Sequence, residues 1–207
     1  LGCGGVLMLP PFYYKAVSDD GLYASVAEVI ERVGNDQLRI YLYHIPPIAQ
    51  VGFSIDRIER LVTDYPKTVV GIKDSSGDWA NTAAMLDRQW DDFRVFVGSE
   101  SFLLANMQNG GAGCISATAN INPAAIDRLY REWDGNDAVA MQADLDRIRS
   151  VVADYPMIPA LKATVASFSG DDAWCTVRPP LVALSEEERS KLAASLQKKR
   201  FEMPGLS

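Results

Sequence analysis

Apolar residues recur along the chain in two alternating patterns. Short runs rich in β-branched residues, typical of strands, are separated by longer segments whose apolar positions repeat every three or four residues, as on one face of a helix. The runs that predict strands are Gly5 to Leu9, Leu38 to Tyr43, Thr68 to Ile72, Phe93 to Val97 and Gly113 to Ser116. The segments that predict helices between them are Asp19 to Val33, Ser54 to Asp64, Trp79 to Trp90 and Glu100 to Asn109. Alternating strands and helices predict a parallel sheet, because each return to a parallel neighbour needs a crossover.

After the fifth strand the pattern predicts helices alone. Asn122 and Pro123 are typical of a helix N-terminus, and SEEE at Ser185 to Glu188 has the form of a capping box. The expected helices are Asn122 to Trp133, Asp137 to Ala153, Ile158 to Phe168 and Ser185 to Gln197.

Two α/β architectures fit five such units: an open doubly wound sheet, or the later part of a (β/α)₈ barrel. The glycine-rich loop NGGAG precedes a strand instead of following one, which argues against a dinucleotide fingerprint. Tyr43, Lys73, Gly98 and Ser116 all stand at the C-terminal ends of predicted strands. Both architectures place their active sites at these ends, so these residues are candidates for chemistry.

Composition narrows the function classes. The chain has 207 residues, 48% hydrophobic and 23% charged, with a formal net charge of -7. The negative charge and the lack of a Lys/Arg-rich block argue against a nucleic-acid partner. No apolar run approaches the ~20 residues of a membrane span, and no signal-peptide pattern is present, so we expect a cytoplasmic protein without membrane contact. The three cysteines lack CxxC spacing and His44 is the one histidine, so we expect no metal site.

Lys73 closes the buried-looking run in VVGIKDSSGDW and has two interpretations. It is either a solvated lysine at a strand end, or a partly desolvated amine whose neutral form attacks a ketone to give a Schiff base. Strand alternation predicts that Val69, Gly71 and Lys73 share one face. Val70 and Ile72 then face the other way. If the first face lines a barrel, Lys73 projects into its mouth.

Tyr43 ends the neighbouring run RIYLYHIPP. By alternation it shares a face with Tyr41, and it is either a core aromatic or a proton relay beside the lysine. His44 follows it, before the turn-like IPPIAQ, and is a candidate to face a substrate.

Four short motifs stand in order on the predicted strand ends. They are YHIP at Tyr43 to Pro46, GIKDSSGD at Gly71 to Asp78, GSE at Gly98 to Glu100 and GGAGCISATAN at Gly110 to Asn120. Together they resemble the dihydrodipicolinate synthase and N-acetylneuraminate lyase family of class I pyruvate aldolases. The similarity runs from LMLPPFYYK near the start to RPPLVALSEEER near the end.

The resemblance implies an α/β fold, a (β/α)₈ TIM barrel followed by a helical C-terminal extension, assembled as a homotetramer. Residues 1–132 then hold strands four to eight of the barrel, and residues 133–207 form the extension. On this correspondence the first three β/α units are missing, together with the Gly-Thr-Thr-type loop that holds the pyruvate carboxylate in the family. The resemblance therefore implies a fragment of a longer protein.

The resemblance also implies roles for individual residues. Lys73 matches the family's Schiff-base lysine, and Tyr43 matches its proton-shuttling tyrosine. Tyr14 matches a tyrosine that in some members reaches into the neighbouring subunit's site. The implied substrate contacts are Tyr14, His44, Ile48, Gly98, Glu100, Ser101, Ile115 and Ser116.

Ile48 is a departure from the synthase pattern. In the synthase an arginine at this place grips the carboxylate of aspartate semialdehyde, and an apolar side chain lacks the paired donors that a carboxylate prefers. The sequence thus predicts a Schiff-base lyase for pyruvate, a 2-keto-3-deoxy sugar acid or a related 2-oxo acid, without a metal or organic cofactor. Two alternatives stay open: a dehydratase or hydratase-aldolase using the same iminium, and an incomplete fragment or paralogue that only binds a 2-oxo acid.

Overall fold

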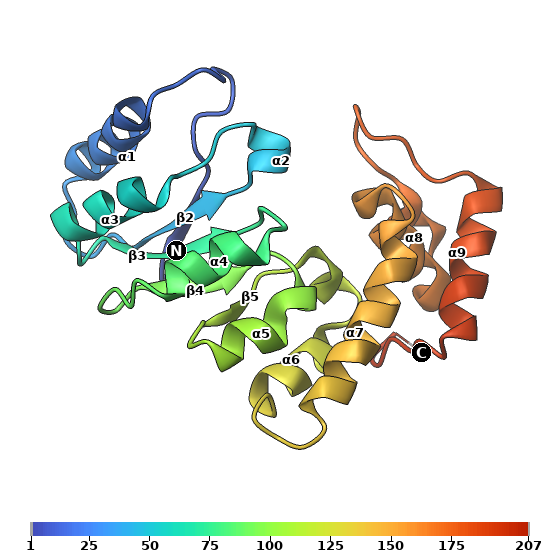
Figure 1. Ribbon diagram of the computed structural model, residues 1–207. Helices are drawn as coiled ribbons and strands as arrows, with labels where there is room; N and C mark the ends of the chain where they lie inside the picture. Colours follow the sequence, from blue (N-terminus) through green and yellow to red (C-terminus); the bar gives the residue numbers. More distant parts are fainter. Residues whose placement is uncertain (1, 207) are drawn as a thin grey trace. The chain divides into compact units, whose positions relative to one another are not determined.

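The computed structural model describes residues 2–206 (Figure 1). The chain divides into two compact units, with the boundary between Ile115 and Ser116, directly after the last strand. The division into a barrel part, 1–132, and an extension, 133–207, stays a prediction.

The first unit is built on a parallel sheet of five strands. They are β1 (Val6–Met8), β2 (Ile40–His44), β3 (Val69–Asp74), β4 (Arg94–Val97) and β5 (Gly113–Cys114). The five predicted strands are confirmed, with ends that differ by a few residues. Neighbours in the sheet are also neighbours in the chain, in the order β1-β2-β3-β4-β5, and all pairs are parallel. This is the order of a barrel wall, whereas a doubly wound sheet reverses its strand order at a switch point.

Helices follow each of the first four strands. They are α1 (Asp19–Val33), α2 (Pro46–Ala49), α3 (Ile55–Asp64), α4 (Trp79–Leu86), the 3₁₀ turn η1 (Glu100–Phe102) and α5 (Leu103–Gln108). Helix α1 has the predicted bounds, but α2 was not predicted. Helix α4 stops short of the predicted end at Trp90, because Gln89 and Asp92 adopt left-handed backbone angles and Trp90 turns to pack edge-on against Phe93.

The core of this unit lies between the sheet and its helices. Ile40 and Leu42 of β2 and Ile72 of β3 are fully buried there. The helices contribute Leu22, Val26, Ile58, Leu61, Val62 and Met85. Burying side chains of this size stabilises the fold by about 1.5–3 kcal/mol each, so this face fixes how the strands lie.

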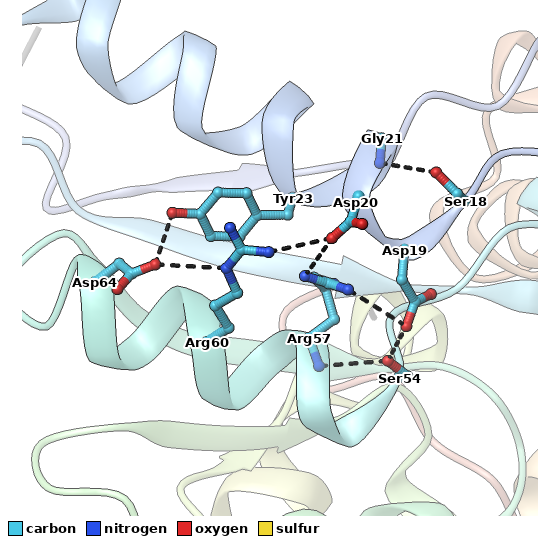
Figure 2. Close-up of polar contacts among 9 residues, drawn as sticks. All are labelled: Ser18, Asp19, Asp20, Gly21, Tyr23, Ser54, Arg57, Arg60 and Asp64. Carbon is cyan, nitrogen blue, oxygen red and sulfur yellow. Dashed lines mark hydrogen bonds and ion pairs between the residues drawn. The ribbon is translucent and has the colours of Figure 1, made fainter.

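Polar contacts join α1 to α3 on the outer surface (Figure 2). The Asp20 carboxylate pairs with Arg57 at 3.2 Å and with Arg60 at 3.1 Å. Arg60 also stacks over the Tyr23 ring, 3.8 Å from its centroid. The Tyr23 hydroxyl donates to Asp64 at 2.7 Å, and this bond raises the pKa of Tyr23. Exposed pairs of this kind contribute little singly, but together they fix the contact between the two helices.

A buried amide holds the short last strand. The Asn106 side chain donates to the carbonyls of Val95, at 3.1 Å, and Gly113, at 2.9 Å, and so ties β4 to β5. A Cβ on Gly111 would lie 2.1 Å from the Asn106 Oδ1, so only glycine lets the loop pass this amide.

The second unit is helical. It contains the 3₁₀ turn η2 (Ala117–Asn120), α6 (Pro123–Arg131), α7 (Ala138–Ala153), α8 (Met157–Ser169), the 3₁₀ turn η3 (Asp172–Cys175) and α9 (Glu186–Lys198). The four predicted helices are confirmed, and so is the capping box between Ser185 and Glu188. Asn122 precedes α6, but its side chain makes no capping bond there. Within residues 2–206, every helix is too short or too polar to cross a bilayer.

Gly71 of β3 has no room for a side chain. A Cβ there would lie 2.5 Å from the Arg94 carbonyl oxygen and 2.6 Å from the Tyr41 ring. We expect Gly71→Ala to lower the free energy of unfolding in urea by about 1–3 kcal/mol, the usual cost of overpacking. Gly4→Ala is the matched control, since nothing lies within 4 Å of its added methyl group. Equal stabilities of the two variants would contradict the close packing of Gly71 against the Arg94 carbonyl and the Tyr41 ring.

Candidate functional site

Two polar side chains meet at the C-terminal ends of β2 and β3. Tyr43 and Lys73 are directly paired in the parallel register. The Lys73 Nζ lies 2.9 Å from the Tyr43 hydroxyl and 4.2 Å from the centroid of its ring. Both side chains are half-buried. The phenol thus touches the amine through its oxygen and its ring face, which is the arrangement that a shared proton needs.

The pairing depends on an irregularity in the sheet. Ile40 pairs with Val69, but the next residue, Tyr41, pairs with Gly71, so the register shifts by one residue. Val69 consequently joins the helix-facing core beside Ile72, and the prediction that Val69 shares the face of Lys73 is wrong. Simple alternation does not predict such a bulge. An extra residue in one strand turns the side chains that precede it to the opposite face of the sheet. The predicted common face of Gly71 and Lys73 is unaffected.

A buried carboxylate fixes the loop that follows the lysine. Asp74 is 4% exposed and accepts bonds from the Ser76 backbone nitrogen at 2.9 Å, the Asn81 amide at 3.0 Å and the Thr82 hydroxyl at 2.7 Å. Asp78 then caps α4 through the backbone nitrogen of Ala80. The sequence analysis did not single out Asp74. The signal was available, because an aspartate side chain that accepts from the backbone nitrogen two residues later forms an Asx turn.

His44 makes a buried contact with the segment that follows α2. Its ring is buried and its Nδ1 accepts from the backbone nitrogen of Phe53 at 3.0 Å. Gly52 lacks the Cβ that would lie 2.7 Å from the ring carbon Cε1. His44 pairs in register with Asp74, whereas Tyr43 pairs with Lys73, so successive side chains leave the strand on opposite faces. The geometry gives His44 a structural contact, and its contact with substrate stays a prediction.

The loop after β4 adds three predicted residues. The Gly98 backbone nitrogen donates to the Asp74 carbonyl at 2.6 Å, and a Cβ there would lie 2.0 Å from the Ser75 hydroxyl oxygen. Glu100 is 2% exposed, and the Ser101 backbone nitrogen donates to the Ser99 hydroxyl at 3.2 Å. Gly98 thus lies against the loop that follows Lys73, while Glu100 and Ser101 begin η1.

Tyr14 and Ile48 lie on two exposed segments of the same edge. Tyr14 is 72% exposed in the loop between β1 and α1, and Ile48 is 76% exposed on α2. Lys15 joins the segments, because its ammonium donates to the Phe12 carbonyl and, at 3.0 Å, to the Ala49 carbonyl. Lys15 is the one charged residue between residues 9 and 18, and its ammonium is bonded to backbone carbonyls. The exposed side chains of this loop are mainly apolar or aromatic, such as Phe12, Tyr13 and Tyr14.

The last two predicted residues stand where β5 ends. The Ile115 backbone nitrogen donates to the Val97 carbonyl at 2.9 Å, which continues the strand pairing. Ser116 is buried, and its hydroxyl lies 3.0 Å from the Thr118 hydroxyl and 3.3 Å from an Arg149 nitrogen. Arg149 was not among the predicted residues, because it is 33 positions away in the chain and carries no motif of its own.

Comparison with known proteins gives the family. Residues 1–199 match the model of the dihydrodipicolinate synthetase family. The chain belongs to this family.

Individual relatives agree with this assignment. An uncharacterized DapA-like lyase of Chloroflexus aurantiacus is 31% identical over 199 residues, covering 96% of this chain and 66% of its own length. The crystal structure of dihydrodipicolinate synthase from Agrobacterium tumefaciens is 33% identical, with a TM-score of 0.84 over 95% of this chain and 66% of that one. YagE from E. coli K12, solved in complex with pyruvate, superimposes with a TM-score of 0.86 over 97% of this chain and 68% of that one; at 24% identity it supports the fold alone. The chain thus spans about two thirds of the length of these relatives.

Burial of His44 makes the stability of this family member depend on pH. Burial lowers the pKa of His44, while the Asp74 carboxylate acts to raise it, and the bond from Phe53 requires an unprotonated Nδ1. In the unfolded chain His44 takes up a proton near pH 6.5, whereas in the folded chain its lowered pKa keeps it neutral at that pH. The stability that His44 contributes to the fold is therefore fully present above pH 6.5 and is lost as the pH falls below it. We expect the free energy of unfolding to fall between pH 6.5 and 5 by at most about 1.4 kcal/mol per pH unit from this group.

Urea unfolding of the chain and of His44→Gln across this range measures the effect. The variant is expected to lose the part of the slope that His44 causes. Identical slopes in the two proteins would show that the imidazole is not held unprotonated.

Proposed function

We propose that this chain carries the reactive pair of a Schiff-base-forming lyase for pyruvate, a 2-keto-3-deoxy sugar acid or a related 2-oxo acid. The observation that carries the proposal is the 2.9 Å contact between the Lys73 Nζ and the Tyr43 hydroxyl, at the strand ends where barrel enzymes of this kind do chemistry. The family provides the reaction class.

The chemistry begins with the lysine as nucleophile. The neutral amine of Lys73 attacks the ketone carbon and forms a carbinolamine, which loses water to give an iminium. The hydroxyl on the far carbon of the scissile bond then loses its proton, and that carbon leaves as an aldehyde. The iminium accepts the electron pair of the broken carbon–carbon bond, which lies one atom away from the iminium carbon, and becomes an enamine. Protonation of the enamine and hydrolysis of the iminium return the amine and release the 2-oxo acid.

Tyr43 is the group placed to move protons in these steps. Its hydroxyl accepts from the ammonium form of Lys73 at 2.9 Å, and the same contact allows it to donate when the amine is neutral. A proton lost from the carbinolamine nitrogen or gained by the leaving hydroxyl can pass through this oxygen. Asp74 holds the following loop and so keeps the strand end that bears Lys73 in place.

The proposed parent architecture is a (β/α)₈ barrel in which β1 to β5 are strands four to eight. Two facts support this: the strands follow one another in sheet order, and about one third of each relative's length lies outside the matched region. In this arrangement the missing units supply the loop for the pyruvate carboxylate. We further propose a homotetramer, and catalysis by Lys73 without a metal or an organic cofactor.

The distal end of the substrate is proposed to be uncharged. Ile48 stands exposed on α2 at the place where the synthase carries its arginine, and Lys15 is engaged with backbone carbonyls. A hydroxylated or aromatic end suits this edge better than a carboxylate.

The alternative is a dehydratase or a hydratase-aldolase that uses the same iminium. Product analysis with candidate acids distinguishes cleavage from dehydration. Release of pyruvate and an aldehyde supports cleavage, and loss of water alone supports dehydration. Adduct formation without either product leaves binding only.

Borohydride trapping tests the central step. Incubation with pyruvate and borohydride is expected to raise the intact mass by one reduced pyruvate in the chain and to leave the mass of Lys73→Ala unchanged. Lys67→Ala, which removes an exposed lysine six residues earlier, is the matched control and should label like the parent. Labelling of Lys73→Ala to the same extent would reject Lys73 as the nucleophile.

Loss of the phenol should slow this step. We expect Tyr43→Phe to reduce the rate of trapping by about 10²-fold or more, the usual contribution of a positioned proton donor. Tyr41→Phe removes a hydroxyl from the same face of β2 and is expected to trap at the parent rate. Intact-mass measurement of samples quenched at successive times gives both rates. Equal rates for Tyr43→Phe and the parent would exclude Tyr43 as the proton relay.

A further inference from the structure

The second unit contains an apolar groove that the proposed lyase chemistry does not use. One wall is a single face of α8, because Ile158, Leu161, Lys162 and Val165 follow one another at the three- and four-residue spacing of neighbours on a helix. The groove has a volume of about 450 Å³, which lies within the range of small-molecule sites. Every residue that lines it belongs to the second unit, so its shape is set by that unit alone.

The other wall comes from η3 and from the segment that follows α9. Trp174 belongs to η3, and Met203 and Leu206 come after α9. Met203 is buried, whereas Ile158, Trp174 and Leu206 are 52%, 47% and 40% exposed. Large apolar side chains therefore stand open along the rim, where a ligand with an apolar body would cover them.

Lys162 gives the groove one positive charge. Its ammonium lies 5.4 Å from the centroid of the Trp174 ring, within the range of a cation–π contact. Within residues 2–206 no carboxylate pairs with this ammonium, and the described residues that line the groove include no acid. The other polar lining residue is Asn120, whose side-chain nitrogen donates to the Ala117 carbonyl at 2.8 Å. Apolar walls thus surround a single cation that has no counter-charge.

This charge pattern selects the class of ligand. We propose that the groove binds a small organic monocarboxylate, with its carboxylate at Lys162 and an aromatic or branched apolar body between Trp174 and α8. A free amino acid fits less well, because its ammonium would find no acidic partner here. A phosphate ester fits less well too, because it carries more charge than one ammonium neutralises and prefers several donors. This site is separate from the Lys73 chemistry and does not depend on it.

Calorimetric titration of the whole chain with phenylacetate tests the proposal. Phenylacetate has no ketone, so it forms no Schiff base, and Lys73→Ala is expected to bind it like the parent. Benzylamine has a similar body and the opposite charge, and is expected to bind at least about tenfold more weakly. Lys162→Met keeps an apolar side chain but loses the ammonium, and should raise the Kd for phenylacetate about tenfold. Lys162→Arg keeps the charge and should bind more tightly than Lys162→Met.

A charge placed on the rim gives a second test. Ile158→Glu sets a carboxylate beside the groove and should also raise the Kd for phenylacetate about tenfold, because like charges repel. Val182→Glu is the matched control, since Val182 is 79% exposed and lies outside the lining, and it should bind like the parent. Thermal melting of every variant reports folding. If Lys162→Met does not fold, Lys162→Arg and Ile158→Glu carry the test.

Three results would overturn the proposal. The first is equal affinity for phenylacetate and benzylamine, or an unchanged Kd in folded Lys162→Met and Ile158→Glu. The second is the absence of saturable binding up to about 10 mM phenylacetate, which is weaker than a specific site requires. The third is a second copy of the chain as the occupant: sedimentation would then show a dimer that Ile158→Glu dissociates and that excludes phenylacetate.

Discussion

The pairing of β2 with β3 is the constraint on which the site depends. In a parallel pair each side chain has a fixed neighbour, so the register that sets Ile40 and Leu42 into the core also sets Tyr43 beside Lys73. A shift by one residue would turn the lysine toward the helices and leave a buried ammonium without the phenol. The register is held from both sides: fully buried apolar side chains pack on the helix face, and the Tyr41 ring fills the space over Gly71 on the other.

The buried polar side chains next to Tyr43 and Lys73 in sequence bond mainly to groups that hold the backbone in place. Asp74 satisfies the turn after the lysine and the start of α4, and His44 accepts from the chain where it leaves α2. Each is buried and bonded, as buried polar groups need to be. Tyr43 and Lys73, the proposed reactive pair, therefore lie on strand ends whose continuation is fixed, and both side chains are half-buried.

The sequence predicted the helices and strands better than it predicted which face of a strand each side chain occupies. Hydrophobic periodicity placed α1 at its observed bounds. Ser185 before α9 and Glu188 in its first turn formed the expected capping box, because these features depend on residues within a few positions. Val69 was assigned to the wrong face since a bulge arises from the pairing of two strands, which alternation within one strand does not contain. The substrate role predicted for His44 came from the turn-like IPPIAQ that follows it, and this local pattern does not contain the backbone bond from Phe53 to the His44 ring. Arg149 reaches Ser116 from a helix far along the chain, and no local pattern marks that contact.

The most direct test of the account is to locate the trapped pyruvate in the sequence. After reduction and tryptic digestion, a modified Lys73 is no longer cleaved, so the account predicts a single labelled peptide that runs from Thr68 to Arg88 with Lys73 inside it. A label spread over exposed lysines such as Lys67, or carried by a different lysine, would contradict the assignment of Lys73 as the nucleophile that Tyr43 serves.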